Sequence, residues 1–282
     1  MSVKQWVVHF SEGDQTMKEL LGGKGANLAE MTKARLPVPP GFTVTTDACR
    51  AYYATGGSLP VGLFAQVEDA MRRLESAKGQ RFGDTKDPLL VSVRSGSVTS
   101  MPGMMDTILN LGLNDETVEG LARMTGNRRF AFDCYRRLIQ MFANVVFGVD
   151  SMHYEQHLHK MKSENGWAQD RDVPADGWEE LIVQYKSVTR RLAGKEFPQK
   201  VSEQLELAVE AVFRSWNNQR AKVYRKVHRI PDEQGTAVNI QSMVFGNMGD
   251  DCGTGVVFTR NPSTGEKKLF GEYLTTPREK MS

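Results

Sequence analysis

The chain has 282 residues, 40% of them hydrophobic and 25% charged, and a formal net charge of +2. This composition is typical of a globular protein, and the balanced charge gives no reason to expect a nucleic-acid partner. No apolar run approaches the roughly 20 residues that a membrane-spanning helix needs, so we expect no membrane contact.

The first 112 residues alternate between strand and helix patterns. A strand is predicted over Gln5–Phe10, and a glycine-rich turn, Gly22–Gly25, runs into a helix. A turn with two prolines leads into a strand that ends at Val44, and Thr46 is expected to cap the next helix. A further amphipathic helix is indicated by apolar residues at helical spacing, namely Leu63, Val67, Ala70, Met71 and Leu74. We interpret residues 1–112 as a mixed α/β subdomain.

An apolar run from Leu89 to Val93 predicts a buried strand that ends at Arg94. A loop of small, hydroxyl-bearing and glycine residues follows as far as Thr107. This order places a permanent positive charge beside a backbone rich in donors, as polyphosphate chemistry requires. The segment read alone is also compatible with an ordinary turn. Apolar side chains inside the loop suggest a flap that folds over a ligand: Met101, Met104 and Met105.

Residues 113–197 are predicted to form a helical subdomain, because apolar residues recur at helical spacing in 127–147 and again in 181–192. Residues 198–282 return to a mixed pattern, which we interpret as a second, incomplete α/β subdomain. A long helix is predicted to begin at Val201 and to reach towards Val227.

The last subdomain also carries strand patterns. Ala237–Val244 alternates as a strand does, and residues 255–259 and 268–274 indicate a strand pair joined by a turn.

Lys24 lies in the turn Gly22–Gly25, just before a helix. A helix N-terminus offers unpaired N–H groups and a partial positive charge, which suit a phosphate group. The spacing is not that of a Walker-type P-loop, and a glycine turn with an exposed lysine is an equally good interpretation of this segment alone. Lys24 and Arg94 together favour phosphate binding, because phosphoryl transfer repeatedly uses two or more cations. The sequence does not show that they meet.

The strand end Gln241–Val244 could hold a purine, with Met243 against its face and the Val244 backbone and Gln241 at its edge. An ordinary core strand is the simpler interpretation of these residues alone. Asp250 and Asp251 begin a second glycine-rich turn. Adjacent carboxylates more often cap a turn than bind a metal, so Thr254 and its glycine neighbours are the better candidates for a phosphate contact.

The three cysteines, Cys49, Cys134 and Cys252, are far apart, and no pair has the spacing of a zinc site or a disulfide framework. Reduced thiols are therefore expected. The N-terminus does not look like a signal peptide, so a cytoplasmic location is the simplest prediction.

Five segments together resemble the pyruvate, phosphate dikinase family and occur in that family's order. The Met-Pro-Gly-Met-Met-Asp-Thr run is the most specific, and the resemblance covers nearly the whole chain. The segments are G-G-K-G-A-N-L-A-E-M from Gly22, V-P-P-G-F-T-V-T-T from Val38, S-V-R-S-G from Ser92, S-M-P-G-M-M-D-T-I-L-N-L-G from Ser100 and G-T-G-V-V-F-T-R-N-P-S-T-G-E from Gly253.

The resemblance implies an ATP-grasp-like nucleotide-binding domain of the α+β or mixed α/β class with a helical insert. In that family the domain takes ATP, phosphate and Mg²⁺ and transfers the β-phosphoryl group to a carrier histidine on a separate domain. A barrel domain then makes phosphoenolpyruvate from pyruvate. Lys24 and Arg94 match the family's phosphate-binding residues and are our catalytic candidates. The expected nucleotide-binding residues are Gly96, Thr99, Ser100, Met101, Gly103, Met104, Asp106, Thr107, Gln241, Met243, Val244, Thr254 and Gly255.

Residues 275–282 do not resemble the family, and the segment that carries its metal ligands is not found. We therefore expect a fold incomplete at its C-terminus, no metal ligands in this chain, and no turnover without the phosphohistidine domain and the pyruvate-binding barrel. An alternative is a naturally short dikinase-like protein that binds or regulates without catalysis. A fragment of a glucan-acting dikinase fits the Met-Pro-Gly-Met-Met-Asp run less well.

Overall fold

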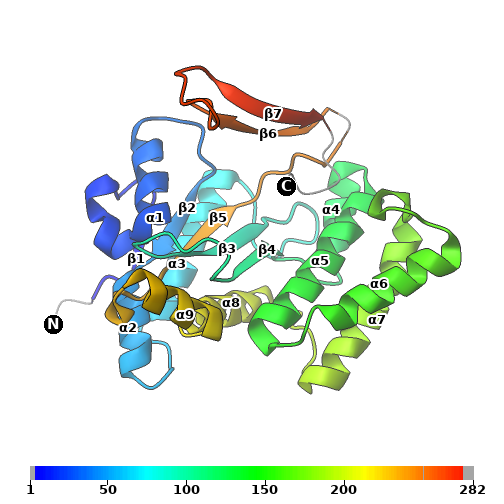
Figure 1. The fold of residues 1–282 in the computed structure, drawn as a ribbon. Coiled ribbons are helices and arrows are strands. Elements are labelled where there is room, and N and C mark those ends of the chain that lie inside the picture. Colours follow the sequence, from blue (N-terminus) through cyan, green and yellow to red (C-terminus); the bar gives the residue numbers. More distant parts are fainter. Residues whose placement is uncertain (1–3, 250, 276–282) are drawn as a thin grey trace.

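The structure is a computed structural model that describes residues 4–249 and 251–275. Its centre is a five-stranded sheet in the order β1-β2-β5-β3-β4, and each neighbouring pair of strands is antiparallel. A second, two-stranded sheet pairs β6 with β7 (Figure 1). The strands are β1 (Val7–His9), β2 (Gly41–Val44), β3 (Val91–Gly96), β4 (Thr107–Leu111), β5 (Ala237–Ser242), β6 (Gly253–Phe258) and β7 (Phe270–Thr275).

Helices cover the sheet and extend beyond its β4 edge (Figure 1). Helix α1 packs on β2, β3 and β5, while α8 packs on β3, β4 and β5, and α4 to α7 form the helical part. The helices are α1 (Lys18–Lys33), α2 (Thr46–Ala54), α3 (Leu63–Lys78), α4 (Thr117–Thr125), α5 (Arg128–Phe147), α6 (Met152–Asn165), α7 (Ala175–Ala193), α8 (Val201–Ser215) and α9 (Gln219–His228).

The two faces of the sheet differ in chemistry, because successive strand residues point to opposite sides. One face supplies the main hydrophobic core, with Phe42, Val93 and Ile240 as members from three adjacent strands. The opposite face lies under α1 and carries a row of polar residues across the three central strands. Thr43 on β2 pairs in register with Asn239 on β5, and Asn239 pairs with Arg94 on β3. Strand pairing therefore sets Arg94 in a cross-strand row of polar residues rather than in the apolar core.

Strand β3 extends beyond the predicted end at Arg94. It continues to Gly96, because Ser95 and Gly96 pair with Val238 and Ala237 of β5. The chain then returns as β4, which the sequence patterns did not predict, and Thr107 pairs with Arg94. The stretch between Gly96 and Thr107 is thus the connection of a β-hairpin, with both ends anchored in the sheet.

Two helix details also differ from prediction. The side chain of Thr45, not Thr46, caps α2 by accepting a hydrogen bond from the N–H of Ala48. The long helix expected from Val201 is two helices, α8 and α9. The break falls where the side chain of Asn218 accepts a hydrogen bond from the N–H of Ala221 and starts α9.

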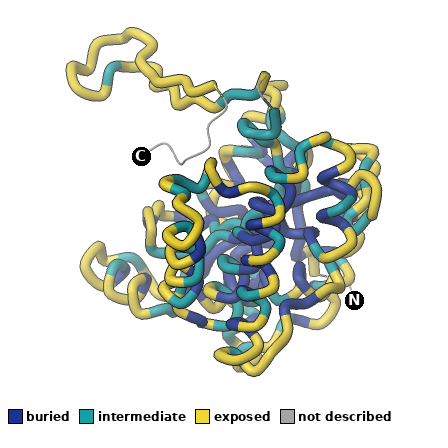
Figure 2. Tube along the Cα trace, turned by 90° about the vertical axis from the view of Figure 1, so that its right-hand side faces the viewer, coloured by how far each residue is buried: buried dark blue, intermediate teal, exposed yellow. Residues whose placement is uncertain are grey.

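The predicted strand pair near the C-terminus is confirmed as the β6–β7 hairpin. Figure 2 shows this hairpin reaching away from the rest of the molecule as an almost wholly exposed ribbon. Strand β5 of the third predicted subdomain lies inside the sheet formed by the first, whereas the division at residues 112 and 197 stays a prediction. No helix in the described ranges is long and apolar enough to cross a bilayer.

Candidate anion-binding site

Glycines bring α1 into contact with the end of β3. Gly22 has φ 69° and ψ 168°, which interrupts the helix and gives the segment after it an N-terminus of its own. A Cβ on Gly22 would lie 1.7 Å from the carbonyl oxygen of Gly96, and the N–H of Gly23 donates to the carbonyl oxygen of Ser97 at 2.9 Å. A Cβ on Gly25 would lie 2.8 Å from the Asn239 side chain. The turn therefore requires glycine for close backbone approach, beyond what an ordinary turn requires.

The contact between α1 and the end of β3 also fixes the position of Lys24. Its ammonium donates a hydrogen bond to the carbonyl oxygen of Ser95 at 3.1 Å, so the side chain lies along the end of β3. The Lys24 residue is exposed to solvent, yet its pKa is lowered. The larger cause is partial burial of the ammonium, and the smaller is the positive charge of Arg94. The structure thus brings together the two cations that the sequence analysis paired.

The side chain of Arg94 forms no hydrogen bond or ion pair with any described residue. Burial lowers the pKa of its guanidinium, and its Nε is buried with no hydrogen-bond partner among the described residues. The Nδ2 of neighbouring Asn239 is likewise buried and unpartnered, while its Oδ1 accepts a hydrogen bond from the Thr43 hydroxyl at 2.9 Å. Buried donors that lack protein partners are costly unless a water or ligand oxygen satisfies them. Two such donors, one of them on the Arg94 cation and both near Lys24, favour an anion.

A cavity of about 770 Å³ lies between α1 and the connection from β3 to β4. Among the described residues no acidic side chain lines it, and the basic ones that do are Lys18 and Lys24. Six of the predicted site residues line this cavity, namely Lys24, Gly96, Ser100, Met101, Gly103 and Thr107.

Sequence reasoning missed several residues of this wall. Asn27, Leu28 and Met31 line the cavity together with Lys24, as the spacing i, i+3, i+4 and i+7 of one helix face allows. That spacing was the available signal. Lys18 also lines the cavity, although it precedes the helix break and had no signal of its own.

Arg94 does not line the cavity and lies beside it, close enough to act on the charge of Lys24. Five other predicted residues lie farther away. Gln241 donates from its side-chain amide to the carbonyl oxygen of Pro39, and the N–H of Met243 donates to Leu90. Val244 is 68% exposed. Thr254 and Gly255 belong to β6 of the exposed hairpin. The structure does not bring these five to the cavity, and their role in nucleotide binding stays a prediction.

The connection from β3 to β4 is docked on α8 and α9. Met101 is buried and packs in one apolar cluster with Trp216 and Ala221, and Met104 and Met105 pack against the same cluster. The side chain of Asn218 donates to the carbonyl oxygen of Met104 at 3.1 Å. The methionines expected on a flap thus hold it to a hydrophobic wall. Thr99, Met104 and Asp106 belong to this segment but do not line the cavity.

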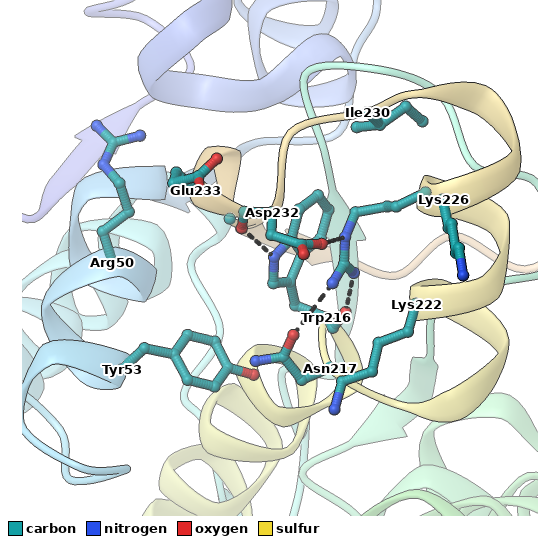
Figure 3. Close-up of a pocket in the computed structure, with 11 residues that line it drawn as sticks. Arg50, Tyr53, Trp216, Asn217, Lys222, Lys226, Ile230, Asp232 and Glu233 are labelled. Carbon is teal, nitrogen blue, oxygen red and sulfur yellow. Dashed lines mark hydrogen bonds and ion pairs between the residues drawn. The ribbon is translucent and has the colours of Figure 1, made fainter.

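The wall behind the flap is built around Trp216 (Figure 3). Its indole N–H donates to the carbonyl oxygen of Asp232 at 2.9 Å, and the guanidinium of Arg225 stacks on its ring at 4.2 Å. Arg225 is 1% exposed and bonds Asp232, Asn217 and the Trp216 carbonyl oxygen. A second cavity, of about 840 Å³, opens here, but its most buried charge, Arg225, is satisfied by protein groups. We therefore assign this cluster to supporting the flap.

An ion pair links Asp106 of the flap to Arg220 of α9, with 3.1 Å between Asp106 Oδ1 and Arg220 Nη2. Burial raises the pKa of Asp106, while Arg220 opposes the shift. We expect Arg220→Ala to raise the open population of the flap by about 1.4-fold to fivefold, because a partly exposed ion pair contributes about 0.2–1 kcal/mol. Hydrogen exchange of the flap amides measures this. Arg72→Ala, which removes an exposed pair with Asp69, is the control; equal flap exchange in both variants would contradict the prediction.

A cavity whose described lining carries lysines and no carboxylate, beside Arg94 and two unpartnered donors, is typical of a phosphate-binding α+β domain. Comparison with known proteins gives the family. The family model described as pyruvate phosphate dikinase, AMP/ATP-binding domain, matches residues 18–78 and 57–273. The chain belongs to this family. The predicted resemblance and the mixed α/β, ATP-grasp-like fold are confirmed.

Similar proteins extend well beyond this chain. It is 56% identical over 271 residues to pyruvate, phosphate dikinase of Clostridium symbiosum, which covers 96% of this chain and 31% of that protein. It is 54% identical over 277 residues to the chloroplastic dikinase 1 of Zea mays, covering 97% and 29%. For the chloroplastic dikinase 1 of Arabidopsis thaliana the identity is 54% over 264 residues, covering 94% and 27%. The chain thus spans less than a third of the length of these relatives.

Proposed function

We propose that this chain binds ATP for a pyruvate, phosphate dikinase, in which the β-phosphoryl group of ATP passes to a carrier histidine. The overall reaction would convert ATP, phosphate and pyruvate to AMP, pyrophosphate and phosphoenolpyruvate. The observation that carries the proposal is the acid-free cavity beside Lys24 and Arg94. Family membership supports a phosphotransferase with ATP as substrate.

The chain's own residues would act by position and charge. The Arg94 guanidinium and the Lys24 ammonium would hold non-bridging phosphate oxygens, and the N–H groups after Gly22 would add dipolar attraction. The flap would exclude water above them, which strengthens these interactions. Each effect is electrostatic, as expected for phosphoryl transfer.

Mg²⁺ is proposed as a cofactor of the full enzyme from the resemblance alone. The described residues contain no group of three or more His, Cys, Asp or Glu side chains placed to hold a metal ion. Asp250 lies outside the described residues. The described residues lining the cavity therefore do not fit a metal site.

The phosphohistidine domain and the pyruvate-binding barrel are proposed partners from the family resemblance. We propose that the isolated chain does not form phosphoenolpyruvate, because the resemblance places the carrier histidine and the pyruvate-binding site on separate domains. A coupled pyruvate assay that shows turnover by the isolated chain would refute this. The final residues 276–282, which do not resemble the family, lie outside the described residues. A cytoplasmic location also stays a proposal, since the Zea mays and Arabidopsis thaliana relatives are named chloroplastic.

Titration calorimetry tests the binding proposal. We expect ATP to bind the isolated chain and adenosine to bind at least about tenfold more weakly, because the cations and donors recognise phosphate rather than the nucleoside. The titrations need matched ionic strength, since exposed charges are screened by salt. Equal affinity for ATP and adenosine, or no ATP binding, would contradict the proposal.

A further inference from the structure

Lys18 lines the cavity from the side of α1 that precedes the helix break. It is the first residue of α1, and the interruption at Gly22 turns the rest of the helix away from it. A Cβ on Gly23 would lie 3.7 Å from Lys18 Cε and 3.5 Å from the carbonyl oxygens of Ser97 and Val98. The aliphatic stem of Lys18 therefore lies over Gly23, at the point where the flap leaves β3.

The Lys18 ammonium has no ion pair or hydrogen bond with any side chain or carbonyl in the part of the chain that the structure describes. The acidic residue one turn before it, Asp14, is occupied by the Lys33 ammonium at 3.2 Å and by the Thr16 hydroxyl. Lys24, by contrast, already donates to the carbonyl oxygen of Ser95. Lys18 is thus the lysine of this cavity whose ammonium forms no bond within the described residues.

The charge of the cavity wall also favours a bound polyanion. Lys18 and Lys24 line it, Arg94 lies close enough to lower the pKa of Lys24, and no carboxylate faces them from the wall. Like charges gathered without counter-charges raise the free energy of the empty site, and a polyanion relieves this.

We infer that Lys18 is a third phosphate-binding cation, which contacts the phosphate chain from the flap side of the turn while Lys24 and Arg94 contact it from the sheet. This rests on the proposed function, because it needs a phosphate chain in the cavity. Lys18 is exposed, so its stem loses rotamer freedom on binding, and its contribution is smaller than that of a buried cation.

Titration calorimetry with inorganic tripolyphosphate tests Lys18 directly. Lys18→Met should bind about threefold to tenfold more weakly than the unchanged chain, and Lys18→Arg should restore binding to within about twofold. The matched control is Lys78→Met, which removes an exposed lysine at the end of α3. It should bind as the unchanged chain does. Thermal unfolding should give the same midpoint for all variants, because neither lysine is buried.

The outcomes separate the two proposals. Equal tripolyphosphate affinity in Lys18→Met and the unchanged chain would overturn the role of Lys18 and leave the ATP site standing. Equal weakening in Lys18→Met and Lys78→Met would also overturn it, since net charge alone would then explain the loss. If the unchanged chain does not bind tripolyphosphate, the proposed function and the role of Lys18 both fail.

Discussion

Arg94→Ala is expected to weaken binding of ATP and of tripolyphosphate by at least about tenfold, because a charge-assisted contact in a partly buried site is lost. The fold should survive. The Arg94 side chain forms no hydrogen bond in the described ranges, so its removal leaves no protein group unsatisfied. Titration calorimetry measures the affinity, and urea unfolding measures the stability.

Arg94→Lys separates charge from geometry in the same experiment. Lysine keeps the charge but loses the planar fork of donors, so we expect intermediate affinity. In a full-length dikinase, Arg94→Ala should slow the ATP half-reaction strongly and leave the pyruvate half-reaction intact. Equal loss in both halves would indicate misfolding and would contradict a local role.

Gly22→Ala is expected to lower the free energy of unfolding by about 3 kcal/mol or more, through two effects. The residue has φ 69° and ψ 168°, a backbone conformation almost confined to glycine, which costs another residue about 1–3 kcal/mol. Its Cβ would also lie 1.7 Å from the Gly96 carbonyl oxygen, so α1 must separate from β3. Losses of stability of this size arise from a specific structural cause, here the clash of the new Cβ with the backbone of β3.

Gly148→Ala is the matched control for that substitution. Gly148 ends α5 with φ 72°, and a Cβ there would meet nothing within 4 Å. It should lose about 1 kcal/mol, the backbone term alone. Urea unfolding at one temperature compares the two. An equal loss in both variants would show that the contact between Gly22 and Gly96 does not hold α1 on the sheet.

Local patterns predicted much of the fold. The amphipathic helices and the strands with apolar alternation were found, because burial on one face leaves a period in the sequence. The β4 strand was missed because its five residues, Thr107–Leu111, are too few for a clear alternation to stand out. The break before α9 was missed because the apolar spacing carries across Trp216, while the cap at Asn218 is a single polar residue.

The candidate site was predicted in its parts but not in its assembly. Lys24 and Arg94 were paired by chemistry, yet only the tertiary contact of Gly22 with Gly96 shows that they meet. The sequence predicted that the flap folds over a ligand. It did not predict that Met101 of the flap packs against Trp216, a residue far away in the chain. Contacts at such separation leave no periodic signal in a single sequence, and Lys18 was missed for the same reason.

The central claim is that the cavity between α1 and the flap holds the phosphate chain of ATP. Hydrogen–deuterium exchange of the isolated chain, with and without ATP, tests it most directly. Slower exchange is predicted at the amides of residues 22–31 and 95–107, which border the cavity. Unchanged exchange in both segments, with protection instead at residues 216–235 around the second cavity, would contradict the claim.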